Sequence, residues 1–333
     1  MHFKTLLIAL SSLDFLSLAE KFRLLKFLKP LAEHEPKRAL DFLERCSYDQ
    51  IARLSSRDSA RALREKNWNA PLLVRRSKVA ALACETFGIK MALYGQPEYP
   101  PLLREIPDPP FALYYRGSLA PLFGKTVSVV GTRRLSPDGK KAARDFARDA
   151  ASDGLCVVSG LAWGADGQAH QGALDAFFDG KAKLAMTAAV LAGGVDNVFP
   201  PSHKKLAAQI IQNGGAILSE CPPTVPAEKW RFVQRNRIIA ALSPATVVIQ
   251  APPGSGAMLT ADFALGYNRE LFFHEACFSP AAMEISRAAE KRLCAQKESS
   301  ACRKLDTSPQ KYVDSGALVI HNFEEFAAVL GTE

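Results

Sequence analysis

The chain has 333 residues and a mass of 36.2 kDa, which favours two domains over one. Hydrophobic residues make up 48% and charged residues 23%, and the 21 glycines and 21 prolines follow no period, so a disordered, collagenous or coiled-coil chain is excluded. No stretch reaches the ~18 uncharged apolar residues of a membrane helix, so we expect a cytoplasmic protein with no membrane partner. The seven cysteines are widely spaced and never form C-x-x-C, which indicates reduced thiols rather than disulfides or a zinc site.

The first 80 residues carry most of the net charge. They contain 16 Lys and Arg against 9 Asp and Glu, which is +7 of the +8 of the whole chain. Leu24, Leu25, Leu28 and Leu31 follow a helical spacing, and no β-branched run interrupts it. We therefore predict a small basic helical domain over residues 1–80, whose charge suits a polyanionic partner.

Residues 81–125 form a lead-in rich in proline and glycine. Prolines at positions 97, 100, 101, 107, 109 and 110 forbid a long helix. We expect this segment to pack onto the domain that follows and to end in a short strand over Ala112–Tyr115.

Residues 126–333 alternate between short apolar runs and amphipathic, helix-like segments. The runs recur about every 30 residues, at Thr126–Val130, Leu155–Ser159, Ala185–Leu191, Ala216–Leu218 and Ala245–Gln250. Uninterrupted apolar strands are buried on both faces, as in a parallel sheet. Ala142, Phe146 and Ala150 mark one face of the first crossover helix, and Gly154 stands where its C-terminal cap belongs. The pattern predicts a doubly wound, Rossmann-like α/β domain.

Nearly every predicted strand is followed by glycine. Ligands of such sheets bind beyond the carboxyl ends of the strands, where glycine lets backbone amides approach an anion and a helix start adds its positive end. One glycine loop could be only a tight turn, but four converging loops favour phosphate binding. The text after the first strand is not G-x-G-x-x-G, and no G-x-x-x-x-G-K-[ST] occurs, so dinucleotide and P-loop sites are not expected. We expect no cofactor.

Arginines gather in the loop after the first strand and around Phe232. They are Arg133, Arg134, Arg231, Arg235 and Arg237. Guanidinium groups bind phosphate bidentately, and an aromatic ring beside them offers a stacking surface for a base. The segment Arg235-Asn236-Arg237 could be a solvated helix start, but Asn is a poor helix former and favours a functional role. The pattern predicts a nucleic-acid surface.

Five blocks of sequence resemble one family in order and spacing: "VSVVGTRRLSPDG", "VVSGLAWGADGQAHQGAL", "AVLAGGVDNVFPPSHKKLAAQIIQNGGAILSE", "RFVQRNRIIAALSPATVVIQA" and "GSGAMLTADFALGYNRELF". They are similar to the DNA processing protein A family (DprA, also called Smf) over about 85–275. The resemblance implies a binder of single-stranded DNA that protects incoming DNA in natural transformation and competence and helps to load the RecA recombinase. It also implies a homodimer and a sterile-alpha-motif-like N-terminal domain. The sequence of residues 279–306 differs from the family pattern, because it is helix-like and rich in lysine.

The resemblance also implies a set of site residues. The single-stranded-DNA pocket falls on Arg133, with Arg134 beside it, on Lys229 and Phe232, and on Arg235-Asn236-Arg237. Backbone amides near phosphate are expected from Gly160, Gly164, Ser255 and Gly256. The pair Trp230-Arg231 departs from the smaller residues expected there, and either narrows the pocket or adds a stacking surface. No catalytic residue and no metal ligand are expected.

Three other interpretations remain open at the level of sequence. The segment "PPGSGAMLT" resembles the phosphate loop of nucleotide phosphoribohydrolases of related fold, but Thr260 stands where those enzymes carry a catalytic Glu. Asp166 and His170, four residues apart on a helix, are too few for a metal site and are better explained as a local hydrogen-bonded pair. The third alternative is an adaptor whose loops bind nothing.

Overall fold

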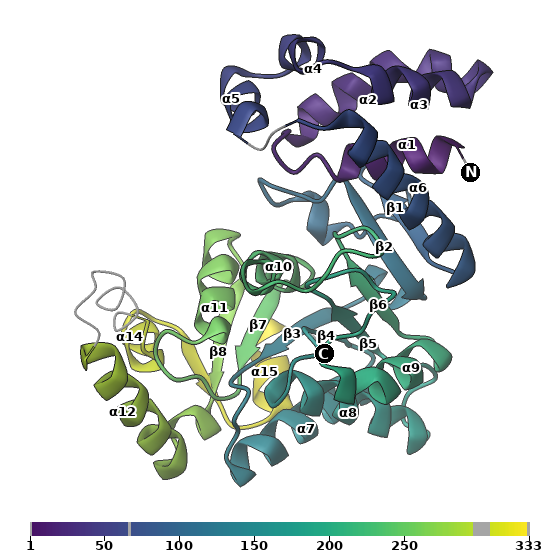
Figure 1. Ribbon diagram of the computed structural model, residues 1–333. Coiled ribbons are helices and arrows are strands. Elements are labelled where there is room, and N and C mark those ends of the chain that lie inside the picture. The colour runs from purple at the N-terminus through teal and green to yellow at the C-terminus, as the bar shows by residue number, and fades with distance from the viewer. Residues whose placement is uncertain (1, 66–67, 296–306, 332–333) are drawn as a thin grey trace.

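The computed structural model describes residues 2–65, 68–295 and 307–331 (Figure 1). Residues 2–65 and the start of the second range are helical, as predicted for residues 1–80. The helices are α1 (His2–Ser11), α2 (Leu18–His34), α3 (Pro36–Arg45), α4 (Tyr48–Leu54), α5 (Arg57–Glu65) and α6 (Ala70–Thr86). Helix α6 ends 11 residues before the first proline of the lead-in, at position 97. No helix within the described residues is both long and apolar enough to cross a membrane.

Glu20 joins the starts of helices α2 and α5. Ser17 and Glu20 form a reciprocal capping box at the start of α2, in which the Ser17 amide donates to Glu20 Oε2 at 2.7 Å. The same carboxylate accepts hydrogen bonds from the Ser56 amide and from the Ser59 hydroxyl, at the start of α5. Burial by itself raises the pKa of Glu20, but these hydrogen bonds outweigh it and lower the pKa from 4.5 to about 2.

Glu20→Gln is expected to lower the free energy of unfolding at pH 7 by about 1–3 kcal/mol, because charge-assisted hydrogen bonds are lost. A carboxyl whose pKa is lower in the folded state stabilises the fold above pH 4.5, and this contribution disappears as the pH falls through about 2. Denaturant unfolding of both proteins between pH 7 and pH 2 measures the difference. It should shrink as the pH falls, and exposed Glu85→Gln should show no such difference; a difference independent of pH would contradict the assignment.

Nine strands form one sheet in the described part of the chain, in the order β1-β2-β6-β5-β4-β3-β7-β8-β9. The seven neighbouring strands β6, β5, β4, β3, β7, β8 and β9 run parallel to one another. Strand β2 pairs antiparallel with both β1 and β6. This confirms the mainly parallel, doubly wound fold. The strands are β1 (Lys90–Leu93), β2 (Ala112–Gly117), β3 (Thr126–Val130), β4 (Cys156–Ser159), β5 (Thr187–Val190), β6 (Ala216–Ser219), β7 (Ala245–Val248), β8 (Glu270–His274) and β9 (Leu318–Ile320).

Three strands, β1, β8 and the three-residue β9, have no counterpart among the apolar runs predicted from the sequence. Strand β1 has four residues and begins with exposed Lys90, and β8 begins with exposed Glu270 and ends with His274. Their hydrophobic stretches are short and bounded by charged or polar residues, so they carry little periodicity. Because β1 and β2 both join the sheet, the lead-in forms one edge of it.

Helices cover both faces of the sheet (Figure 1). Helices α7 (Pro137–Ser152), α8 (Ala165–Phe178) and α15 (Phe323–Leu330) pack on one face, and α10 (Lys229–Ala241) and α11 (Gly256–Gly266) pack on the other. The sequence prediction for α7 is confirmed, since Phe146 and Ala150 are buried and Gly154 follows the helix with a φ of +85°. The remaining elements are η1 (Leu102–Arg104), η2 (Ala120–Phe123), η3 (Pro201–His203), α9 (Lys204–Gln212), η4 (Glu275–Phe278), α12 (Pro280–Ala295) and α14 (Pro309–Asp314).

The N-terminal helices share a hydrophobic cluster with the adjacent edge of the sheet. Leu6 and Leu28 belong to the same buried cluster as Leu93, Tyr114 and Ile217. The hydroxyl groups of Ser11 and Tyr114 also form a hydrogen bond of 2.5 Å. The division at residues 80 and 125 stays a prediction, because the helices and the sheet bury side chains in one another.

The order of the parallel strands reverses between β3 and β7. From β3 the chain proceeds through β4 and β5 to β6 on one side, and then crosses to β7 on the other side of β3. In open α/β sheets, the crevice at such a reversal is where ligands bind, outside the carboxyl ends of the strands. The loops that follow β3, β4, β5 and β7 therefore border the expected ligand site.

Candidate nucleic-acid interface

Close contact between loops forms the floor of the crevice. A Cβ on Gly131 would lie 2.7 Å from the Ala165 Cβ and 2.9 Å from the Gln250 carbonyl oxygen. Gly164 has a φ of +79°, and a Cβ there would lie 2.2 Å from the carbonyl oxygen of Thr132. Glycine is thus required at both positions, because any side chain would push the loops apart. The loop after β4 lies directly against the loop that carries Arg133.

Arg133 and Phe232 lie together on the surface of this crevice. The exposed Arg133 guanidinium carbon is 5.6 Å from the centre of the half-buried Phe232 ring, in the first turn of α10. Phe199, in the segment after β5, meets the same ring edge-to-face with 5.7 Å between ring centres, and 44% of Phe199 is exposed. A cation and two rings are therefore available to a ligand on one surface. Phe199 was not among the residues predicted from the sequence, although an aromatic residue in a loop after a strand was an available signal.

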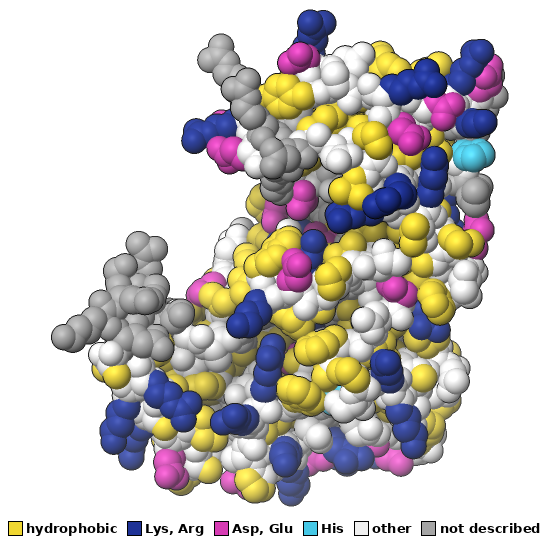
Figure 2. Space-filling view, in the orientation of Figure 1, with side chains coloured by type: hydrophobic (Ala, Val, Ile, Leu, Met, Phe, Trp, Pro, Cys, Tyr) yellow, Lys and Arg dark blue, Asp and Glu magenta, His cyan; other side chains and the backbone are white. Residues whose placement is uncertain are grey.

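Trp230 and half-buried Arg231 form a second pair of a cation and an aromatic ring, in which the tryptophan is exposed. The Arg231 guanidinium carbon stacks 4.2 Å from the centre of the Trp230 ring, and the indole Nε1 donates to Glu228 Oε2 at 2.7 Å. Both residues line a cleft of about 900 Å³ between the α/β domain and the N-terminal helices. Figure 2 shows Lys and Arg side chains standing among apolar side chains over this hollowed face. Acidic side chains such as Glu220 also line the cleft, so its charge is mixed.

Arg235 is buried and holds three elements together. Its Nη1 donates to the Gly160 carbonyl at 2.7 Å and to the Val190 carbonyl, at the ends of β4 and β5. A Cβ on Gly160 would lie 2.5 Å from the guanidinium, so glycine makes room for this arginine. Burial raises the pKa of the neighbouring Asp166 carboxyl, and the positive charge of Arg235 counteracts that rise.

Asn236 and Arg237 are also engaged within the protein. Asn236 Nδ2 donates to the Gly256 carbonyl at 3.0 Å, at the start of α11. Arg237 donates to the Asp108 carbonyl at 2.7 Å and forms an ion pair with Glu220. These contacts fix α10 against the loops, and contact of these side chains with DNA stays a prediction.

The other predicted residues are more accessible. Arg134, Lys229 and Gly256 are exposed. Ser255 precedes the first residue of α11, and its hydroxyl is buried without a hydrogen-bond partner among the described residues. A ligand at this helix start could therefore use an otherwise unsatisfied hydroxyl.

Asp166 and His170 do not form the pair that their spacing suggested. Asp166 accepts a hydrogen bond from the Ala162 amide at 3.3 Å, whereas His170 Nδ1 bonds the Thr187 hydroxyl at 2.7 Å. Complete burial lowers the pKa of His170 to about 3, so its ring is neutral. The described residues contain no cluster of three or more His, Cys, Asp or Glu side chains that could bind a metal.

The fold and the crevice define a doubly wound α/β protein with an arginine and aromatic rings at the switch point of its sheet. Comparison with known proteins agrees with this class. A family model described as DNA recombination-mediator protein A matches residues 90–311, which is more than half of the chain. The chain belongs to the DNA recombination-mediator protein A family.

Three curated relatives illustrate the similarity. Protein Smf of Borreliella burgdorferi is 33% identical over 189 residues, which are 57% of this chain and 58% of that protein. Protein Smf of Escherichia coli is 39% identical over 174 residues, or 52% and 45% of the two chains. DNA processing protein DprA of Bacillus subtilis is 34% identical over 218 residues, or 65% and 70%. The chain thus spans only about half the length of the first two of these relatives.

Two solved structures extend the similarity to the fold. DNA processing protein A of Streptococcus pneumoniae has a TM-score of 0.66 and 25% identity, over 98% of this chain and 97% of that one. The Helicobacter pylori protein has a TM-score of 0.55 and 27% identity, over 73% and 96%, and its structure describes a single-stranded DNA binding mode. The family resemblance seen in the sequence is confirmed.

Proposed function

We propose that this chain binds single-stranded DNA along the carboxyl edge of its sheet. The observation that carries the proposal is the contact of exposed Arg133 with the Phe232 ring, which in turn meets Phe199. A single strand can splay its bases onto such rings while its phosphates meet the guanidinium. The bases of a duplex are already stacked on one another, so the same surface favours a single strand.

The biological role we propose follows the family. The binding of single-stranded DNA that is described for the Helicobacter pylori relative supports a DNA-processing role in natural transformation and recombination. Within that role, the chain protects incoming strands and helps to load a RecA-type recombinase, acting as a homodimer and without catalysis of its own. RecA loading and dimerisation rest on the family resemblance alone.

An enzymatic function of the phosphoribohydrolase type is the alternative. Thr260, at the position of the catalytic Glu, is buried, and its hydroxyl donates to the Gly256 carbonyl at 3.3 Å within α11. A threonine has no ionisable group to act as a base there. Incubation with nucleoside monophosphates should therefore release no free base. Released base that disappears in a Ser255→Ala variant would favour the alternative.

The direct test of the proposal is a binding titration. Fluorescence anisotropy of a labelled oligonucleotide, alone and annealed to its complement, should show tighter binding of the single strand at every salt concentration. Affinity for both forms should fall as salt rises, because released counterions favour binding. Equal affinity for single strand and duplex would refute the proposed stacking, and no binding of either form would refute nucleic-acid binding altogether.

A further inference from the structure

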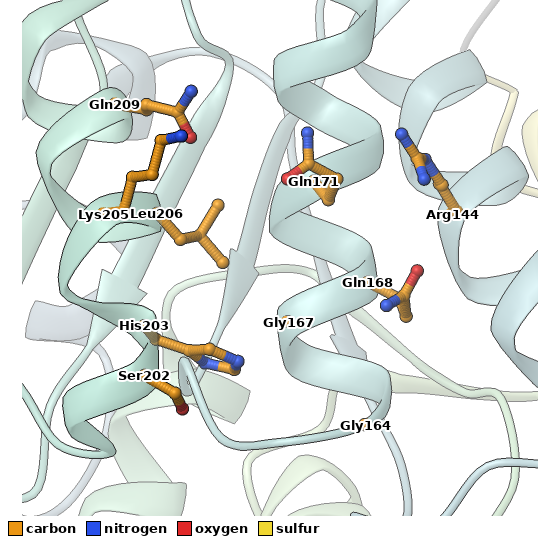
Figure 3. A pocket seen from close by; sticks show the side chains of 10 residues that line it. All are labelled: Arg144, Gly164, Gly167, Gln168, Gln171, Ser202, His203, Lys205, Leu206 and Gln209. Carbon is orange, nitrogen blue, oxygen red and sulfur yellow. The ribbon is translucent and has the colours of Figure 1, made fainter.

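A pocket of about 550 Å³ lies over α8, beside the crevice described above. In Figure 3, α8 occupies the centre, α9 and η3 supply side chains on one side, and Arg144 of α7 stands on the other. The polar side chains that line it are Arg144, Gln168, Gln171, Ser202, His203, Lys205 and Gln209. This lining contains three basic side chains, three amides and one hydroxyl, and no carboxylate. The proposed function does not use it.

Glycines in α8 create this hollow. A Cβ on Gly167 would lie 2.8 Å from His203 Cε1, so the imidazole can pack directly over the helix backbone. A Cβ on Gly172 would lie 2.1 Å from the Arg144 carbonyl oxygen, so α7 can approach α8 closely. Side chains from α7, η3 and α9 therefore surround the α8 backbone, which carries no side chain at Gly167.

The polar groups suit a nucleotide. His203 is held in place, since its Nδ1 lies 2.9 Å from the Leu161 carbonyl oxygen. Arg144 makes two hydrogen bonds to Asp175, at 2.5 and 3.0 Å, so exposed Lys205 is the side chain better placed to meet a phosphate. Amide groups such as that of Gln168 can both donate and accept, which is what the edge of a base requires.

The pocket adjoins the Arg133 and Phe232 surface. Trp163, 50% exposed, donates from Nε1 to the Ser202 hydroxyl at 2.9 Å, and Ser202 lines the pocket. Ser202 follows Phe199 by three residues, and Phe199 contacts Phe232. Gly164, which also lines the pocket, lies against the backbone of Arg133. The bridge between Trp163 and Ser202 thus lies between two adjoining sites.

We infer that this pocket is a second subsite, which binds a further nucleotide of the same single strand with Trp163 stacking on a base at its rim. The inference rests on the proposed function and adds to it. A free nucleotide has the same chemistry, but the pocket adjoins the Phe232 surface directly, so a strand that leaves one site enters the other.

The test measures affinity as a function of oligonucleotide length. Oligothymidylates of four and of twelve nucleotides are titrated against the wild type, Trp163→Ala, and the double variant Gln168→Ala/Lys205→Ala. Trp163→Ala should lose about tenfold in affinity for the longer strand, within the range of one lost stacked base, and the double variant should lose a similar factor because it removes a phosphate contact and a base-edge contact. Both variants should bind the shorter strand as the wild type does. The matched control is Lys181→Ala, which removes an exposed lysine beyond the other end of α8 and should change neither affinity.

Other results would overturn the subsite, its assignment to a strand, or the proposed function. Unchanged affinity of both variants for the longer strand would overturn the subsite, and an equal loss at both lengths would show that the pocket belongs to one site with Phe232. Thymidine monophosphate that binds the pocket more tightly than the longer strand does would overturn the assignment to a strand. If the wild type binds neither length, the proposed function itself fails. Melting curves check folding, and the double variant decides if Trp163→Ala is unstable.

Discussion

Arg235→Ala is expected to lower the free energy of unfolding by about 3–5 kcal/mol, the range for a buried charge that loses its compensating partner, because the Arg235 guanidinium offsets the charge of the nearby buried Asp166. The substitution removes the hydrogen bonds to the carbonyls of Gly160 and Val190, and leaves Asp166 buried beside an empty space. The loss is large because an uncompensated buried carboxylate must either stay charged or take up a proton. Denaturant unfolding followed by circular dichroism measures it.

Two controls separate this effect from a general weakness of the region. Arg134→Ala removes an exposed arginine and should change stability by no more than about 0.5 kcal/mol. The double variant Asp166→Ala/Arg235→Ala should be destabilised by less than the sum of the single variants, because no buried carboxylate remains. A fully stable Arg235→Ala protein would show that Arg235 does not hold the loops, and strict additivity in the double variant would show that Arg235 does not offset the charge of Asp166.

Phe232→Ala is expected to weaken binding of single-stranded DNA by about 1–3 kcal/mol, the range for one lost stacking partner. The salt dependence of DNA binding by this variant should differ little from that of the wild type, because the ring neutralises no phosphate. Arg133→Ala, at the same site, should instead lower the slope of log affinity against log salt by about one unit. Both effects should be nearly independent of base sequence, since neither side chain reads a base edge. Titrations at several salt concentrations distinguish the two signatures.

The neighbouring Val233→Ala is the matched control. Val233 is 46% exposed on the same helix and offers no ring, so its loss should leave affinity unchanged. If Phe232→Ala and Arg133→Ala are folded and bind single strands like the wild type, DNA is bound elsewhere. The cleft lined by Trp230 and the basic helices of residues 1–80 would then be the surface to examine.

The sequence predicted the sheet and its loops because both leave local signals. Each central strand is a short apolar run, and glycine follows most of them, so the order of elements and the converging loops could be inferred. The contact of Arg133 with Phe232 depends on the crossing of the chain from β6 to β7, and it could be expected only from the family resemblance.

The burial of Arg235, Asn236 and Arg237 could not be predicted from the sequence. Three consecutive residues of a helix point in different directions, and a helix at the surface exposes at least one of them. All three are buried because α10 is enclosed by the strand ends, by α11 and by the segment around Asp108. Phe199 and Trp163 could not be assigned to the site from the sequence for a related reason, since only the fold shows that they border the crevice.

Photochemical cross-linking of a single-stranded oligonucleotide that carries 5-iododeoxyuridine tests the central claim most directly. Iodouracil reacts with aromatic side chains that stack on it, and mass spectrometry of the digested protein identifies the residue. We predict adducts at Phe232 and Phe199, which are lost when excess unlabelled single strand competes and persist with excess duplex. Adducts confined to the helices of residues 1–80, with none in the α/β domain, would contradict the account.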